Sequence, residues 1–408
     1  MRVSFSDLDI VGPEAIRDPH GYFGRVRDAA PVVWDERARS WLVTSYEMVT
    51  RALLDDHFSS DRIRPFIAKK LSAPDSDPLV RQAFDVLSNW LVFNDAPIHP
   101  RLRMLINHAF MSKTMLRLNS RFETLCDEIL SSAPNEGAFD LLDTVSTPFS
   151  ASVISELLGV PHQDRERFER WQRLFGPIIG ASLGDSNKYD SLAEGVDELL
   201  RYVRTLIVRQ QEQPQENLLN ELIKAKDQDG ALSEAEVLAT CTLVIFAGSE
   251  TTANLIANSM SALLRFPDQM QRLRDKDVDI HRAVEEFLRF DGSGKAVTRV
   301  VKADTDVLGV EMKAGERVFC ILAAANHDPA VFEQPDELIL DRAGDRKHIA
   351  FGYGAHNCLG SRLARLETAI AIPKMLEKWR RIELAGEREW YPQLLSRGLL
   401  ALPVRVAA

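Results

Sequence analysis

Apolar residues recur at the i, i+3/i+4, i+7 spacing of amphipathic helices through most of this 408-residue chain. The longest such pattern runs from about residue 233 to residue 265. That length is well above the roughly 11–12-residue mean, so it predicts a helix that crosses the molecule. We expect a mostly α-helical fold. The other predicted helices cover residues 46–55, 97–110, 118–130, 141–158, 164–175 and 192–208, with one more that ends near Phe290.

Short stretches rich in β-forming residues predict small β-regions. Residues 31–35 and 40–44 lie on either side of a polar tetrapeptide, which indicates a hairpin. Residues 295–301 and 317–322 also read as strands. Proline, aspartate and serine interrupt residues 58–94, so we expect an irregular segment there that covers a pocket and helps define the substrate. Residues 175–183 separate two predicted helices and suggest a lid.

Composition indicates an ordinary globular protein. Hydrophobic residues make up 45% and charged residues 27%, and the short polar segment 209–217 reads as a surface loop, so we expect a single domain over residues 1–408. The formal net charge of −10 argues against a nucleic-acid partner. The first residues show neither a signal core nor a membrane anchor. We expect a cytoplasmic monomer that does not bind a membrane.

One cysteine stands in a segment suited to a thiolate. Gly352 and Gly354 allow a tight turn before Cys358, and the helical pattern that follows places Cys358 at a helix N-terminus. A helix start lowers the pKa of a cysteine, and the thiolate is the form that binds metal. The alternative is a buried structural cysteine, as we expect for the other three. Those three are Cys126, Cys241 and Cys320.

The residues around Cys358 occur in a combination that resembles the haem-binding loop of the cytochromes P450. The resemblance implies the P450 fold and one haem b with Cys358 as the iron ligand. A zinc or structural cysteine protein is the competing interpretation. The residues that carry the resemblance are Phe351, Gly352, Gly354, His356, Cys358 and Gly360. All of them except Gly354 are expected to contact the cofactor.

A glycine interrupts the long helical pattern in the segment from Phe246 to Thr252. Gly248 lowers helix propensity by about 1 kcal/mol relative to alanine, so a tight helix crossing with an exposed polar face is one explanation. The segment also resembles the P450 signature in which the helix distorts over the haem. That resemblance implies haem contacts for Ala247 and Gly248. It makes Glu250 and Thr251 the catalytic acid and alcohol that deliver protons during oxygen activation.

Glu286 and Arg289 lie three residues apart on one predicted helix face. The spacing alone carries little weight, because such pairs are common. The position about 70 residues before Cys358 resembles the family's Glu-x-x-Arg motif, with Arg342 as a third partner. We expect a structural ion-pair network that takes no part in catalysis.

Haem carries two propionates, and an acidic protein must supply local cations to hold them. Residues 94–103 resemble the family segment that supplies a histidine and an arginine one helical turn apart, here His99 and Arg103. Arg299 and His356 match the remaining cationic positions. The alternative for each residue is a solvated surface charge.

The segment before Arg299 lacks the proline that many relatives carry. In a regular strand, Lys295, Val297 and Arg299 share one face, so Lys295 could enter the pocket and pair with a substrate carboxylate. Gly292 and Gly294 favour the alternative, in which the strand twists and Lys295 faces solvent. Further substrate contacts are predicted by segment only. They are Trp90 and Val92, which have Leu91 and Phe93 as neighbours, and Val244 on the long helix.

The resemblance implies a monooxygenase that inserts one atom of O2 into a small organic substrate by hydroxylation or epoxidation. Electrons would come from NAD(P)H through a separate ferredoxin and ferredoxin reductase, or a flavodoxin-type donor. Arg362 and Arg365 lie where the family docks that partner. Phenol coupling, desaturation or nitration on the same fold, and a non-catalytic haem sensor, are the alternatives.

Overall fold

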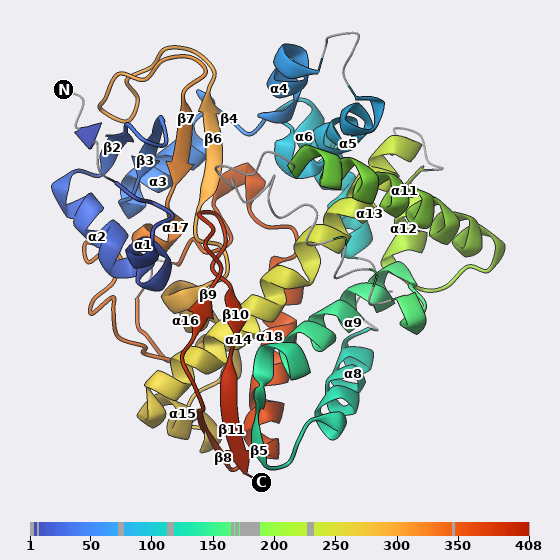
Figure 1. Ribbon diagram of the computed structural model, residues 1–408, viewed down its shortest axis with the longest axis vertical. Coiled ribbons are helices and arrows are strands. Elements are labelled where there is room, and N and C mark those ends of the chain that lie inside the picture. Colours follow the sequence, from blue (N-terminus) through green and yellow to red (C-terminus); the bar gives the residue numbers. More distant parts are fainter. Residues whose placement is uncertain are drawn as a thin grey trace. The chain divides into compact units, whose positions relative to one another are not determined.

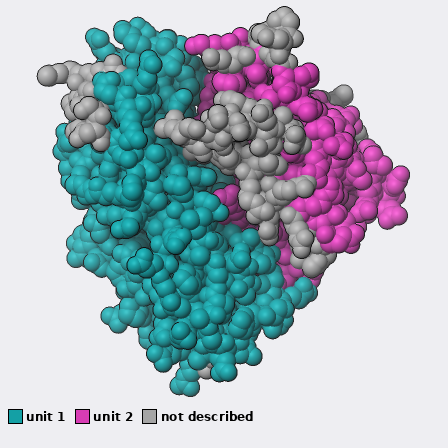
Figure 2. Space-filling view, viewed as in Figure 1, with its two compact units in different colours: residues 1–59, 126–148, 251–408 teal, residues 60–125, 149–250 magenta. Residues whose placement is uncertain are grey.

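The computed structural model describes residues 4–5, 8–71, 77–111, 118–164, 167, 171, 188–226, 232–344 and 347–407. The chain divides into two compact units, coloured separately in Figure 2. Unit 1 comprises residues 1–59, 126–148 and 251–408, and unit 2 comprises residues 60–125 and 149–250. The expected mostly helical fold is confirmed. A single domain over the whole chain stays a prediction.

A six-stranded sheet organises unit 1. Its strand order is β1-β2-β3-β7-β6-β4, and β6 and β7 run side by side in Figure 1. The predicted hairpin is confirmed, because β2 and β3 pair antiparallel and bring Trp34 opposite Trp41. All residues of these two strands are buried, including the polar Asp35 and Ser40 at their ends. The strands are β1 (Ser4–Phe5), β2 (Val32–Asp35), β3 (Ser40–Val43), β4 (Phe58–Ser59), β6 (Val297–Val301) and β7 (Arg317–Cys320).

Two smaller sheets complete the β-structure of the described residues in unit 1. One has the order β5-β11-β8 and is antiparallel throughout, and the other pairs β9 with β10. The strands are β5 (Gly137–Asp140), β8 (Arg381–Leu384), β9 (Glu389–Trp390), β10 (Leu399–Ala401) and β11 (Pro403–Ala407).

The helices of unit 1 carry several of the predicted site residues, such as Thr251, Glu286 and His356. The α16 and α18 helices pack against each other, and α16 begins where the Asp279 side chain accepts a hydrogen bond from the Arg282 N–H. The helices are α1 (Pro13–Arg17), α2 (Pro19–Ala29), α3 (Tyr46–Leu54), η2 (Leu142–Ser146), α14 (Glu250–Arg265), α15 (Pro267–Arg274), α16 (Ile280–Asp291), α17 (Leu322–Ala325), η4 (Gly354–His356) and α18 (Ser361–Lys378).

Unit 2 is helical in its described residues. The α11 helix packs against α5, α12 and α13, and α12 packs against α6. A capping box between Ser233 and Glu236 starts α13. The helices are α4 (Ile63–Lys70), α5 (Pro78–Ser88), η1 (Leu91–Phe93), α6 (Ile98–Phe110), η3 (His162–Asp164), α11 (Lys188–Glu212), α12 (Leu218–Lys226) and α13 (Glu234–Gly248); α8 (Asn119–Ser132) and α9 (Thr147–Leu158) cross the boundaries between the units in sequence.

Two sequence expectations need correction. The long predicted helix is two helices, because α13 ends at Gly248 and α14 begins at Glu250. Residues 58–94 are largely regular, with β4, α4, α5 and η1, because Asp77 caps α5 and Pro78 occupies its first turn. The predicted lid at residues 175–183 lies outside the described residues, as does most of the predicted helix over residues 164–175. Within the described part of the chain, no helix has the length and apolar character needed to cross a membrane.

Candidate active site at Cys358

Cys358 lies in unit 1 at the end of a tight loop that leads into α18. Gly352 and Gly354 have φ angles of +73° and +71°, which an L side chain rarely adopts. The backbone N–H of Cys358 donates to the carbonyl of Phe351 at 2.9 Å, so the loop closes on itself. Two residues further on, Gly360 is the N-cap of α18. The predicted position of Cys358 at a helix N-terminus is confirmed.

Exposure separates Cys358 from the other three cysteines. Cys126, Cys241 and Cys320 are buried, and burial raises the pKa of each thiol to about 12. Their thiolate forms are therefore strongly disfavoured, as expected for core residues. Cys358 is exposed, so its sulfur is accessible to a ligand.

The Glu-x-x-Arg pair forms a buried network on α16. Glu286 accepts from Arg289 Nε at 2.8 Å and from Nη2 at 2.9 Å, and both side chains are about 3% exposed. Arg342 Nε approaches the same carboxylate at 3.1 Å. Arg289 also donates to the carbonyls of Asn326 and Pro335. The network ties the irregular segment after α17 to α16, which agrees with the expected structural role.

A second network on α16 was not expected from the sequence. Glu285 accepts from Arg365 Nη2 at 2.9 Å and lies 3.1 Å from His348 Nε2. Burial raises the pKa of Glu285, but the hydrogen bonds from Arg365 and His348 outweigh it and lower the pKa to about 2. The Arg365 guanidinium also lies 4.6 Å from the ring centroid of Phe351. Arg365 thus connects α16, α18 and the start of the cysteine loop, while Arg362 is exposed.

The four candidate propionate partners divide evenly between the units. Arg299 on β6 is 8% exposed, and His356 on η4 is half-buried; both belong to unit 1. His99 is 4% exposed and Arg103 is half-buried; both lie on α6 of unit 2. Their spacing of four residues places His99 and Arg103 on one face of α6, as predicted.

The break between α13 and α14 lies at the predicted acid–alcohol pair. A Cβ on Gly248 would come 2.3 Å from Ile154 Cδ1, so close helix packing explains the glycine. The hydroxyl of Ser249 is buried and has no hydrogen-bond partner among the described residues. Burial raises the pKa of Glu250 above its usual value, whereas Thr251 is exposed. The break therefore presents an unsatisfied hydroxyl, a carboxyl group that holds its proton to higher pH, and an accessible alcohol.

The candidate substrate residues differ widely in exposure. Trp90 is 1% exposed and donates from Nε1 to Thr242 Oγ1 at 2.9 Å, which makes it a core residue of unit 2. Val244 is also buried, whereas Val92 is 45% exposed. Val297 in unit 1 is half-buried.

The expectation that Lys295 faces solvent is wrong. Its side chain is 1% exposed. Two backbone hydrogen bonds also hold the main chain of Lys295 within unit 1. The N–H of Lys295 donates to the carbonyl of Leu395 at 2.9 Å, and its carbonyl accepts from the N–H of Ala323 at 3.1 Å. Gly294 pairs with Ser396 and does not turn the chain outward.

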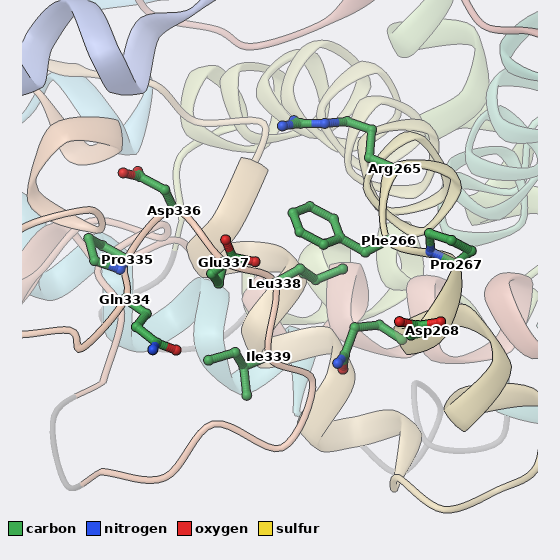
Figure 3. A pocket seen from close by; sticks show the side chains of 11 residues that line it. Arg265, Phe266, Pro267, Asp268, Gln334, Pro335, Asp336, Glu337, Leu338 and Ile339 are labelled. Atoms are coloured by element: carbon green, nitrogen blue, oxygen red, sulfur yellow. The ribbon is translucent and has the colours of Figure 1, made fainter.

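One cavity of unit 1 is lined by none of these groups. Its volume is about 750 Å³, and it is lined by the end of α14, the start of α15 and residues 334–339 (Figure 3). Several of its polar groups already have structural partners. The carbonyls of Pro335 and Glu337 accept from Arg289, and Gln269 accepts from the N–H of Leu340. We therefore place the candidate active site at Cys358, the exposed thiol, and not at this cavity.

Comparison with known proteins defines the class. The sequence matches the family described as Cytochrome P450 over residues 28–279 and 280–405. The chain is 31% identical over 397 residues to a biotin biosynthesis cytochrome P450 of Bacillus subtilis (strain 168), covering 96% of this chain and 97% of that protein. It is 34% identical over 411 residues to the cytochrome P450 monooxygenase PikC of Streptomyces venezuelae, covering 98% and 94%.

Solved structures agree with this class. P450BioI in complex with a hexadec-9Z-enoic acid ligated acyl carrier protein has a TM-score of 0.87 at 30% identity, covering 96% of this chain and 100% of that one. CalO2 has a TM-score of 0.89 at 28% identity, covering 99% of both chains. This chain belongs to the cytochrome P450 family and is an oxidoreductase of the monooxygenase class.

The residues present fit the cofactor of that family. Cytochromes P450 hold haem through a cysteine thiolate and use O2. Cys358 is the exposed cysteine of the four. A Cβ on Gly360 would lie 4.0 Å from the Cys358 sulfur, which is ordinary van der Waals contact, so the start of α18 lies next to that sulfur. Arg299 and His356 supply cations in the same unit.

Proposed function

We propose that this chain is a haem b monooxygenase that inserts one oxygen atom from O2 into a small organic substrate, by hydroxylation or epoxidation. The observation that carries the proposal is that Cys358, in its closed glycine loop, is exposed, whereas the other three cysteines are buried. The bound haem would supply the oxygen-activating iron. The thiolate of Cys358 would hold that iron, and the loop closed by the bond from the Cys358 N–H to the Phe351 carbonyl would keep the sulfur in one position.

Cations of the chain would hold the haem propionates. We assign this role to Arg299 and His356 of unit 1 and to His99 and Arg103 of unit 2. Arginine can bind a carboxylate through two parallel hydrogen bonds, and the buried position of Arg299 strengthens such a contact. Ala247 and Gly248 would line the cofactor face of α13.

Glu250 and Thr251 would deliver protons during the reaction. Thr251 is exposed, so its hydroxyl would be accessible to an ordered water, and Glu250 would pass protons to that water. The raised pKa of Glu250 keeps its carboxyl protonated over a wider pH range. Electrons would come from NAD(P)H through a separate ferredoxin and its reductase, or through a flavodoxin-type donor.

The test is reconstitution with haem, a ferredoxin, its reductase and NAD(P)H under labelled dioxygen. The proposal predicts product carrying one labelled oxygen atom from a substrate found by ferric spin-state titration, and no product from Cys358→Ala. Because one solved relative holds an acyl chain on a carrier protein, acyl substrates belong in that screen. NAD(P)H consumption without an oxidised product across the screen would contradict the proposal and favour a haem sensor.

A further inference from the structure

Lys295 is a buried amine beside the segment that enters the cysteine loop. It lies in the turn between α16 and β6 of unit 1 and is 1% exposed. A Cβ on the preceding residue, Gly294, would come 3.1 Å from the carbonyl of Ala350. Ala350 directly precedes Phe351, the first residue of the loop. The residue before Lys295 therefore packs closely against the residue that precedes the cysteine loop.

The nearby carboxylate is already engaged by other cations. Asp291 accepts from Arg397 Nε at 2.9 Å and lies 3.5 Å from His20 Nε2. Burial raises the pKa of Asp291, but Arg397 and His20 outweigh it and hold the pKa well below its usual range. Among the described residues, the Lys295 Nζ has no hydrogen bond or ion pair. A buried ammonium without a partner is costly, so this position favours a partner that arrives from outside the chain.

Charged Lys295 and Arg397 together face one carboxylate. Burial and, to a smaller extent, the charge of Arg397 lower the pKa of Lys295 to about 7, against the opposing effect of Asp291. Two neighbouring groups stay neutral. His327, which stacks on His20 with centroids 3.7 Å apart, has a pKa lowered well below its usual value by burial, and the Cys320 thiol on β7 has its pKa raised to about 12. Protonation of Lys295 thus creates one positive charge that the surrounding groups leave unbalanced.

We propose that Lys295 anchors a carboxylate of the substrate, so that organic acids are the substrate class of this enzyme. The inference rests on the proposed haem monooxygenase function and assigns the specificity of that same site. An incoming carboxylate would pair with the ammonium in a low-dielectric surrounding, where such a contact is strong. A neutral amide or ester of the same shape would leave the positive charge of the ammonium unbalanced.

The test uses iron-binding probes, so that it does not depend on knowing the substrate. Imidazole and a series of ω-(imidazol-1-yl)alkanoic acids of increasing chain length are titrated into the haem-loaded protein, with the matching carboxamides as neutral controls. The imidazole nitrogen binds the iron and reports occupancy through the absorption spectrum, whatever the tail does. At about pH 6 the acid is expected to bind about 10-fold or more tightly than its amide at one or more lengths, about 1.4 kcal/mol.

Variants separate this role from a structural one. Lys295→Met keeps the volume but removes the charge, and is expected to abolish the preference for the acid. Lys347→Met, at an exposed lysine of the same unit, is expected to keep it. Lys295→Arg keeps the charge at every accessible pH, so its preference should persist above pH 7, where that of the wild type declines. That variant also covers the case in which Lys295→Met does not fold.

Proton uptake gives a second readout. With a free pKa of about 7, Lys295 is mostly neutral at pH 8, and pairing with a carboxylate raises its pKa. Calorimetry in buffers of different ionisation enthalpy should therefore detect uptake of up to about 0.9 proton at pH 8 with the acid and none with the amide. Equal affinity of acid and amide at every length, or a preference that survives in Lys295→Met, would overturn the assignment. No spectral change with imidazole itself would instead contradict the haem function.

Discussion

The ion-pair networks of α16 and the break between α13 and α14 differ in how their polar side chains are paired. On α16, Glu286 and Glu285 each have two cationic or imidazole partners. At the break, the Ser249 hydroxyl has no hydrogen-bond partner and the Glu250 carboxyl has no ion pair among the described residues. A metal ligand needs a fixed position, whereas a proton relay needs groups with hydrogen-bonding capacity to spare. The two regions differ accordingly.

The largest expected effect comes from opening the buried network. Glu286→Ala leaves Arg289 and Arg342 buried without their carboxylate, which should cost about 3–5 kcal/mol of unfolding free energy. Glu285→Ala on the same helix removes a carboxylate that is 45% exposed and should cost about 1 kcal/mol or less. Urea unfolding of both variants measures the difference. Equal losses would show that the two networks do not differ as the burial suggests.

The next effect tests the relay side. Thr251→Val keeps the shape but removes the hydroxyl, and should lower the yield of oxidised product per electron pair by about 10-fold or more, with haem loading unchanged. Thr252→Val is the matched control, because Thr252 is the next residue of α14 and is only 4% exposed. Product and peroxide are quantified together. If Thr251→Val forms as much oxidised product per electron pair as the wild type, Thr251 is not part of the relay.

The pH dependence follows from Glu250. Burial raises its pKa, so the acid form needed for proton delivery is lost only as pH rises through that raised value. Turnover should fall over this window in the wild type and show no such fall in Glu250→Gln, which is slower throughout. The stability contribution has the same sign: it is full below the usual pKa of glutamate and declines as pH rises through the folded-state pKa. Parallel pH profiles of both proteins would contradict the assignment.

The smallest effect concerns the packing at Gly248. Gly248→Ala places a methyl group against Ile154 Cδ1 and should cost about 1 kcal/mol of stability. Ile154→Val removes that Cδ1 atom, so a double-mutant cycle should return a favourable coupling energy of about 1 kcal/mol. Thermal unfolding of the four proteins provides the cycle. Zero coupling would mean that packing does not explain the glycine.

Strong periodicity and turn chemistry were enough to predict much of the fold. The β2–β3 hairpin and α3, α6 and α8 appear where the sequence indicated them. Residues 58–94 were misread because Asp77 and Pro78 act as a helix start, which looks like an interruption in the sequence. The interruption between Phe246 and Thr252 was recognised, but its division of the pattern into two helices at Ser249 was not, because apolar residues continue on both sides of it.

The candidate site could be predicted only in part, because some of its contacts join residues that are distant in sequence. The glycines before Cys358 mark its loop locally, so the position could be found from neighbouring residues. The Glu285–Arg365 pair joins residues 80 positions apart, and no local pattern announces such a contact. The burial of Lys295 likewise depends on Leu395 and Ala323, which are distant in sequence.

The absorption spectrum of the reduced, carbon monoxide-bound protein tests the central claim most directly. The band position distinguishes a thiolate ligand from a histidine ligand on the haem iron. The account predicts the thiolate position for the wild type and its loss in Cys358→Ala, while the three buried cysteines provide no substitute. A histidine-type band in the wild type, or a thiolate band that persists in Cys358→Ala, would contradict it.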